Sequence, residues 1–374
     1  MHRRNIPRLG ITCVALAALA ISAAACSSSG GSSSASGSTS TAPVGVQAEL
    51  NGLSSMSASA RQSFLVSQAE KEGKVVFYSS LDPDEMQAWQ TAFNKAYPKV
   101  NLQIVRMTTA EVLQRAVAES QAHKPVASLY IISGTQPQQM EQASMLAKYT
   151  SPQSQGFSSD DVDASGLFTT VTIDPLVNGF NTTKVKQSQV PTTIQGLTNP
   201  ALKGKLGTTS ADGPLWLGAV YKALGATQGA KVAQQVAANR PSLFSSNTDL
   251  ANALTSGQVP VAFNIIEATV ITAKKKGAPV NYVATEPMMV FPLDIAIAAD
   301  APDPYAAALV YDWTLSEAGG QQVVAQFDDI GPRTDMTYPG QDVITNAKQV
   351  IPFSPAVESN PTQLNSTFTS LFGQ

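Results

Sequence analysis

The chain has 374 residues, of which 43% are apolar and only 14% are charged, and its formal net charge is −3 at pH 7. This length favours two or three domain-sized units, because a single hydrophobic core rarely grows beyond about 250–300 residues. A net charge so close to zero excludes a general nucleic-acid-binding surface, which requires clustered Lys and Arg. We interpret the one basic run, Lys274-Lys275-Lys276, as a solvated face near a helix end.

The N-terminal segment has the pattern of an export signal. A basic stretch at residues 3–8 precedes an apolar stretch at residues 11–25, which is too short for a permanent membrane span. Three alanines precede Cys26, and small residues at that place suit cleavage by a signal peptidase. Residues 1–25 are therefore predicted to be a signal peptide, whose removal takes away Cys13 and leaves one cysteine at the mature N-terminus. The arginine pair in the basic stretch leaves Sec or twin-arginine export open.

The predicted mature N-terminus resembles that of a bacterial lipoprotein, in which the first cysteine carries a lipid anchor. Ordinary secretion with an incidental cysteine is the alternative. Residues 26–46 are rich in Ser, Gly, Thr and Ala, a composition that cannot bury enough apolar surface to offset the entropy of ordering. We expect a flexible tether there, and an extracytoplasmic protein held to the cell membrane by lipid on Cys26.

Strands and helices are expected to alternate along the first part of the remaining chain. Short β-rich runs predict strands at residues 74–80, 100–107 and 128–132. Amphipathic spacing predicts helices at residues 59–72, 83–97 and 108–122, the second of them capped by Asp82. This alternation favours a parallel sheet covered by helices, in which ligands bind beyond the carboxyl ends of the strands.

The second part of the chain repeats this pattern. Residues 168–181 are predicted as two β-rich pieces that flank Asp174-Pro175. Residues 288–299 are long and apolar enough for a buried strand that crosses between two units. Further strands are predicted at residues 205–210, 258–265 and 280–284, and helices at residues 213–224, 228–239, 249–256 and within 303–326.

Five phrases spread along the body carry a family resemblance. They are EGKVVFYSS at residues 72–80, IQGLTNPALKGKL at 194–206, SGQVPVAF at 256–263, SEAGGQ at 316–321 and GPRTD at 331–335. In order and spacing they resemble the extracellular solute-binding lipoproteins of bacterial ABC transporters, family 1, in the clade that includes the ferric-iron-binding proteins.

The resemblance implies an α/β fold of the type II periplasmic-binding-protein (venus flytrap) class, with two lobes that are each a mainly parallel sheet flanked by helices. Lobe 1 is expected at residues 47–172 plus 288–345, and lobe 2 at residues 173–287 plus the C-terminal helices to residue 374. Such a protein is a monomer without a cofactor that captures a small polar solute between its lobes. It delivers the solute to ABC permease and ATPase subunits.

One departure from the family bears on the ligand. Ferric members carry two adjacent tyrosines just after the central strand, where this chain has Ile265-Ile266, and an isoleucine cannot ligate a metal. We therefore expect no iron site. Binding of Fe³⁺ through other ligands, and a ligand-sensing lipoprotein without a transporter, are the alternatives.

The loops that should face the ligand contain many hydroxyls and helix-start amides, which suit an oxygen-rich or phosphate-bearing solute. Asp82, Asp212 and Glu267 would instead suit an amine-bearing solute, although the two aspartates could be helix caps and Glu267 could be solvated. The predicted ligand-binding residues are Ser79, Ser80, Asp82, Ser133, Gly134, Thr135, Thr209, Ser210, Asp212, Asn264, Glu267 and Arg333.

An anchored hydrolase on the same fold is a further hypothesis. It needs a nucleophile paired with a base, and His123 is the only histidine beyond the predicted signal peptide. The sequence contains no G-x-S-x-G phrase. We therefore expect no catalytic residues and no enzymatic activity, and we interpret His123 as a surface residue near a helix end.

Overall fold

The computed structural model describes residues 45–353 and 360–373. The predicted signal peptide, Cys26 and nearly all of the predicted tether lie outside the described residues. Val46, which the sequence assigned to the tether, is the first residue of helix α1 (Val46–Ser54). None of the helices in the described ranges has the length and apolar character of a membrane span.

The alternation predicted for the first part of the body is confirmed. Gly73, at φ +73°, ends the second helix, and the Thr108 side chain caps the fourth helix through a reciprocal pairing with Glu111. The elements are α2 (Ala58–Glu72), β1 (Lys74–Ser79), α3 (Pro83–Ala96), β2 (Asn101–Arg106), α4 (Thr109–Gln121), β3 (Leu129–Ser133), α5 (Gln136–Gln142) and β4 (Leu146–Ala147).

The second part contains the predicted strands and helices together with short pieces that were not predicted, β7, β11 and the 3₁₀ helices among them. Its strands are β5 (Phe168–Asn181), β6 (Leu206–Thr209), β7 (Ser242–Phe244), β8 (Val261–Ile266), β9 (Val280–Val283), β10 (Met288–Ala298) and β11 (Val350–Pro352). Its helices are α6 (Gly213–Leu224), α7 (Ala226–Ala238), α8 (Asn247–Ser256), α9 (Glu267–Lys275), α10 (Pro304–Leu315), α11 (Gly320–Gln326), α12 (Asp342–Thr345) and α13 (Pro361–Phe372). Short 3₁₀ helices are η1 (Pro152–Gly156), η2 (Ser159–Asp161), η3 (Gln187–Gln189), η4 (Gln195–Thr198) and η5 (Pro200–Leu202).

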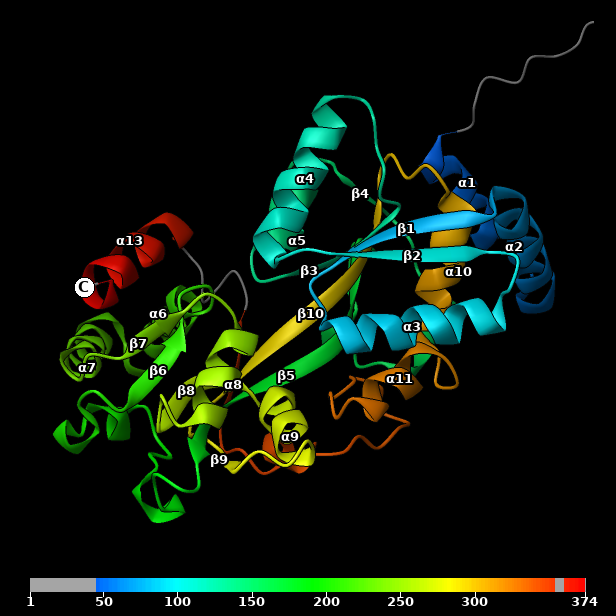
Figure 1. Ribbon diagram of the computed structural model, residues 1–374. Helices are drawn as coiled ribbons and strands as arrows, with labels where there is room; N and C mark the ends of the chain where they lie inside the picture. The colour runs from blue at the N-terminus through cyan, green and yellow to red at the C-terminus, as the bar shows by residue number, and fades with distance from the viewer. Residues whose placement is uncertain (1–44, 354–359, 374) are drawn as a thin grey trace, which may run out of the picture. The chain divides into compact units, whose positions relative to one another are not determined.

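Hydrogen bonding joins these strands into one mixed sheet in the order β2-β1-β3-β10-β5-β8-β6-β7, whereas the sequence suggested two sheets. The group β2-β1-β3 is parallel, and so is the group β8-β6-β7. Between the two groups lie β10 and β5, which pair antiparallel with each other and with their outer neighbours β3 and β8. Figure 1 shows β5 and β10 side by side, between β1 to β3 on one side and β6 and β8 on the other.

Strand β5 is a single strand, which corrects the prediction of two pieces around Asp174-Pro175. The Ile173 N–H donates to the Ile330 carbonyl, on the side of the strand away from β10. Because backbone N atoms two residues apart point to the same side of a strand, the Pro175 nitrogen also points away from β10. Its missing N–H therefore removes no bond from the β5–β10 ladder, and the strand continues through the proline.

Buried apolar side chains form three clusters along this sheet. We call the cluster that includes Phe77, Trp89 and Trp313 the first core, and the cluster that includes Trp216 and Phe263 the second core. A smaller third core lies beneath α8 and α9 and contains Ile265. By its internal contacts the described chain is one unit, so the boundaries of the two expected lobes stay predictions.

A buried ion pair ties the N-terminal helices to the first core. Arg61 on α2 donates to the Asp312 carboxylate on α10, 2.7 Å away, and both side chains are buried. Tyr149 donates to the same carboxylate at 2.8 Å and also receives a hydrogen bond from Arg61. Burial is the largest influence on the Asp312 pKa and raises it, while Arg61 opposes this effect.

Removal of one partner from this buried pair should leave an uncompensated charge. We expect Asp312→Ala to lower the free energy of unfolding by about 3–5 kcal/mol in urea denaturation. The matched control is Lys99→Ala, which breaks an exposed pair with Glu70 and should cost less than about 1 kcal/mol. Equal losses in the two variants would contradict this assignment.

Candidate functional site

Two predicted site residues lie at the carboxyl end of β1. Ser79 is buried, and its hydroxyl accepts a hydrogen bond from the Leu81 N–H at 3.2 Å. Ser80 follows and is half-buried. Asp82 occupies the N-cap position of α3, but its exposed side chain makes no capping hydrogen bond. Its carboxylate is therefore available for hydrogen bonds or ion pairs with groups other than the N–H groups of α3.

The carboxyl end of β3 holds three more predicted residues. The buried Ser133 donates its N–H to Gln136 Oε1 at 3.3 Å, and Gly134 adopts φ +63°, which favours glycine. Thr135 is the N-cap of α5, and its hydroxyl accepts from the Gln139 amide at 3.1 Å. The Ser133 N–H and the Thr135 hydroxyl are therefore already hydrogen-bonded to side chains of α5.

A compact hydrogen-bond network surrounds Asp212, before α6. Thr209 Oγ1 donates to Asp212 Oδ2 at 2.9 Å and accepts from the Asp212 N–H at 3.1 Å. Asn247 Nδ2 donates to the same carboxylate oxygen at 2.8 Å. Asp212 makes no capping bond to α6, so neither aspartate caps its helix through the side chain. Ser210 is exposed and its hydroxyl donates to the Phe244 carbonyl at 3.2 Å.

Asn264 is the most unusual of the predicted residues. It lies in the left-handed region at φ +57°, where the β5–β8 register shifts, and only 4% of it is exposed. Neither its amide oxygen nor its amide nitrogen has a hydrogen-bond partner among the described residues. An unpaired buried polar group costs about 1–3 kcal/mol, so this amide is suited to a partner supplied from outside.

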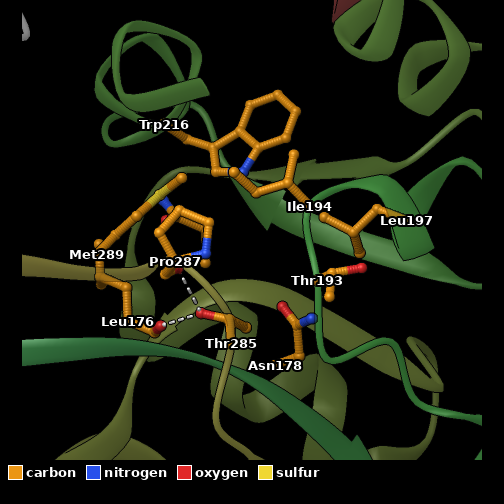
Figure 2. A pocket seen from close by; sticks show the side chains of 10 residues that line it. Leu176, Asn178, Thr193, Ile194, Leu197, Trp216, Thr285, Pro287 and Met289 are labelled. Atoms are coloured by element: carbon orange, nitrogen blue, oxygen red, sulfur yellow. Dashed lines mark hydrogen bonds between the residues drawn. The ribbon is translucent and has the colours of Figure 1, made fainter. Parts of the chain in front are cut away.

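The Asn264 side chain lines a small cavity of about 10 Å³, close to the space of one water molecule. Figure 2 shows Trp216 of α6 on one side of this cavity, and Asn178 and Thr193 on another. The Thr285 hydroxyl is already occupied, since it donates to the Leu176 carbonyl at 3.2 Å.

Glu267 begins α9 and is fully buried, which corrects the alternative that it is solvated. Neither carboxylate oxygen has a donor in hydrogen-bonding geometry among the described residues. Burial raises the pKa of Glu267, and the nearby Tyr282 hydroxyl acts in the opposite direction. Gly340, at φ +78°, packs against this carboxylate, because a Cβ there would lie 3.2 Å from Oε2.

The structure adds three acidic residues that the sequence analysis missed. Glu85 and Asp174 are buried, and Asp329 is half-buried. With Asp82 they form what we call the acidic cluster, because each affects the pKa of at least one of the others. Its members come from the start of α3, from β5 and from the segment after α11, and the Ile173–Ile330 backbone bond holds the last two side by side. The sequence places Glu85 in the first turn of the helix predicted at residues 83–97, and it indicates Asp174 only as a break between two strands. An acid inside a strand of buried residues was the signal that could have identified Asp174.

Burial and, after it, mutual repulsion raise the pKa values within the acidic cluster. Burial is the main cause of the raised pKa of Glu85, and the charges of Asp174 and Asp82 raise it further. Burial raises the Asp174 pKa to about 7, with Asp82 and Asp212 adding to the effect. The Asp329 pKa is raised by burial and then by Glu85 and Asp174. These carboxyl groups therefore act on one another electrostatically.

Lysines from the basic run lie next to this cluster. Lys275 Nζ is 2.6 Å from the Asp328 carboxylate, and Lys276 Nζ is 3.4 Å from that of Asp84. The basic run is thus exposed to solvent and also forms ion pairs, which corrects its interpretation as a solvated face alone. Among the ion pairs found in the described ranges, none includes Glu85, Asp174 or Asp329.

Arg333 and His123 lie in other surroundings. The Arg333 guanidinium donates to Asp335 at 2.6 Å and to the Leu315 carbonyl at 2.9 Å, and it packs over the Phe157 ring. Its donors are thus engaged by protein groups beside the first core. His123 is exposed immediately after α4.

Two further features of the described residues concern ligands. No three His, Cys, Asp or Glu side chains in this part of the chain converge as a metal-binding group. A second cavity, of about 250 Å³, lies between α1 and the segment around Tyr149. Arg61 is among its lining residues and already pairs with Asp312.

The fold is of the α/β class, in which ligands bind beyond the carboxyl ends of the strands. Residues 129–342, more than half of the chain, match the family described as bacterial extracellular solute-binding protein. The chain belongs to this extracellular family, whose members work with the permease and ATPase components of ABC transporters. No curated protein matches the chain.

Solved structures confirm the type II periplasmic-binding-protein fold. Iron-bound HitA from Pseudomonas aeruginosa is 17% identical, with a TM-score of 0.69 over 80% of this chain and 99% of HitA. The substrate-binding protein of an ABC transporter from Agrobacterium tumefaciens is 16% identical, with a TM-score of 0.71 over 82% and 97%. AfuA from Actinobacillus pleuropneumoniae, with fructose-6-phosphate bound, is 19% identical, with a TM-score of 0.69 over 80% and 99%.

Asp174 should make stability depend on pH. Its pKa rises from an ordinary 3.8 to about 7 on folding, so the folded state holds the proton more tightly than the unfolded state. Stability is therefore lost as pH rises through this window, and the loss is complete above it. We expect Asp174→Asn to be more stable than the natural protein by on the order of 3 kcal/mol at pH 8, and nearly equal at pH 4.

Urea denaturation at the two pH values measures this difference. Asp300→Asn, which removes an exposed carboxylate, is the control and should shift stability by less than about 0.5 kcal/mol at either pH. A destabilised Asp174→Asn variant at pH 8 would show that the ionised carboxylate is stabilised by contacts other than those described.

Proposed function

We propose that this protein is the membrane-anchored solute-binding component of an ABC importer, which captures a small polar solute and delivers it to a permease and its ATPase. The observation that supports this most directly is contact between elements from the two ends of the sheet. Lys275 of α9, which covers the third core, lies 2.6 Å from the Asp328 carboxylate after α11, and Lys276 lies 3.4 Å from Asp84 of α3, beside the first core. Elements from both ends of the sheet are thus close enough to contact one small molecule.

The proposed mechanism makes no covalent bond. Each end of the sheet, with its own core, acts as a lobe, and β5 and β10 connect the two. A solute that touches both lobes only when they are close biases the molecule towards the closed form. To convert a mostly open population into a mostly closed one, the extra contacts must contribute about 5 kcal/mol, equivalent to a few charge-assisted hydrogen bonds.

Closure can be measured in solution. We expect small-angle X-ray scattering of the purified protein to show a smaller radius of gyration when a cognate solute is added, because the lobes approach each other. A non-binding solute of similar size is the control and should leave the radius unchanged. Tight binding without any compaction would contradict the two-lobe mechanism.

The lipid anchor depends on one residue, Cys26. We expect Cys26→Ala to release the protein from the membrane fraction into the surrounding medium, because no other cysteine follows the predicted cleavage site. Fractionation followed by immunoblotting measures the distribution. Cys13→Ala is the matched control, since Cys13 lies inside the predicted signal peptide, and this variant should stay with the membrane. Retention of the Cys26→Ala variant after an alkaline wash would argue against the lipid anchor.

A further inference from the structure

We propose that the cavity of about 250 Å³ between α1 and the segment around Tyr149 is a second binding site, for a small organic anion with one carboxylate and an apolar body. This inference goes beyond capture of a transported solute, because none of the residues that line this cavity is among those predicted to bind that solute. A cavity of this size has many times the volume that one water needs, and an apolar cavity of about 150 Å³ already binds benzene. It therefore fits a molecule the size of an aromatic ring with one small substituent.

The charge of the cavity wall favours an anion. Arg61 and Lys148 are the charged side chains among the described residues that line it, and no acidic side chain is among them. Arg61 is only 7% exposed and is neutralised by its buried ion pair with Asp312. Lys148 is exposed and forms no ion pair among the described residues. One positive charge is therefore left over, and a single carboxylate matches it.

The same wall offers apolar surface and hydrogen-bonding groups. Leu50 and Leu53 of α1 and the buried Tyr149 are its apolar part, and the Arg61 guanidinium lies over the Tyr149 ring, 5.6 Å from its centre. The polar lining residues are Asn51, Ser54, Thr150 and Ser165. A predominantly apolar lining with a few polar groups and one charge is the usual composition of a small-molecule site.

Helix α1 is held at the cavity by Gln47. Gln47 Nε2 donates to the Lys148 carbonyl at 3.0 Å, and Gln47 Oε1 accepts from the Lys148 N–H at 2.8 Å. These two bonds fix the Lys148 backbone beside α1 and leave its ammonium group available to a ligand. A ligand here would contact α1, α2 and the segment after β4 at once, so its binding should stabilise the folded chain.

The test compares three probes of similar shape and different charge by isothermal titration calorimetry and thermal shift at neutral pH. Benzoate is the anionic probe, benzamide its neutral analogue and benzylamine its cationic analogue. We expect saturable binding of benzoate at millimolar or lower concentration, with binding of the other two weaker by about 10-fold or more, since they lack the charge-assisted contact. If benzoate does not bind saturably, or if benzamide binds equally well, the inference is overturned.

Two variants locate the bound probe. Lys148→Met keeps an apolar stem and removes the charge, so it should weaken benzoate binding by about 10-fold and leave benzamide binding unchanged. Ser54→Phe places a ring at the cavity and should abolish benzoate binding. The Ser54 hydroxyl bonds only to the Asn51 carbonyl within α1, so an unchanged melting temperature is expected and would show that the loss is not due to misfolding.

Lys231→Met is the matched control, because Lys231 is an exposed lysine of α7 that does not line the cavity. Its affinity for benzoate should equal that of the natural protein. Full affinity in both Lys148→Met and Ser54→Phe would place benzoate elsewhere on the molecule and would overturn the inference, while the proposed capture of a solute would be unaffected.

Discussion

The antiparallel pairing of β5 with β10 is the constraint on which the arrangement of the other elements depends. These strands pair from Phe168–Ala296 to Leu176–Met289, and every other strand of the sheet connects through one of them. Their buried backbone groups must stay paired, so the strands cannot separate at low cost. Any movement between the two cores must therefore come from bending or twisting of this pair. On the edge of β5 away from β10, the bond from Ile173 to Ile330 comes before Pro175 and the pairing with β8 begins after it, at Leu176. At Pro175 itself, β5 therefore pairs with β10 only.

The acidic cluster lies at this same point, because Asp174 immediately precedes the proline. Burial of a carboxylate carries a desolvation penalty of several kcal/mol, and like charges nearby add to it. A chain selected only for stability would replace such groups by amides or apolar residues. Strongly perturbed carboxyl groups are enriched at functional sites. Asp174 therefore places an unfavourable buried charge beside Pro175, in the part of β5 that forms ladder hydrogen bonds on one side only.

Periodicity and capping residues in the sequence predicted most helices and strands, because these signals are local. Thr108 with Glu111, and Gly73 at a helix end, act within one turn of the chain. The joining of two expected sheets into one could not be predicted, since it depends on the register between β10 and β5, which are more than a hundred residues apart. The site was predicted in part for the same reason. Hydroxyls at strand ends were visible, but the meeting of Glu85, Asp174 and Asp329 arises only from tertiary folding.

The lysine pairs beside the cluster differ from the buried acids in what they can contribute. Lys275 and Lys276 remain 62% and 68% exposed, so their pairs with Asp328 and Asp84 contribute about 0–1 kcal/mol each and weaken as salt increases. Together they fall short of the roughly 5 kcal/mol that an open-to-closed change requires. Buried carboxylates are screened far less, so contacts made by Glu85 and Asp174 keep their strength in salt. The two lysine pairs therefore join the end of α9 to the segment after α11 and to α3 without being strong enough to fix the closed form.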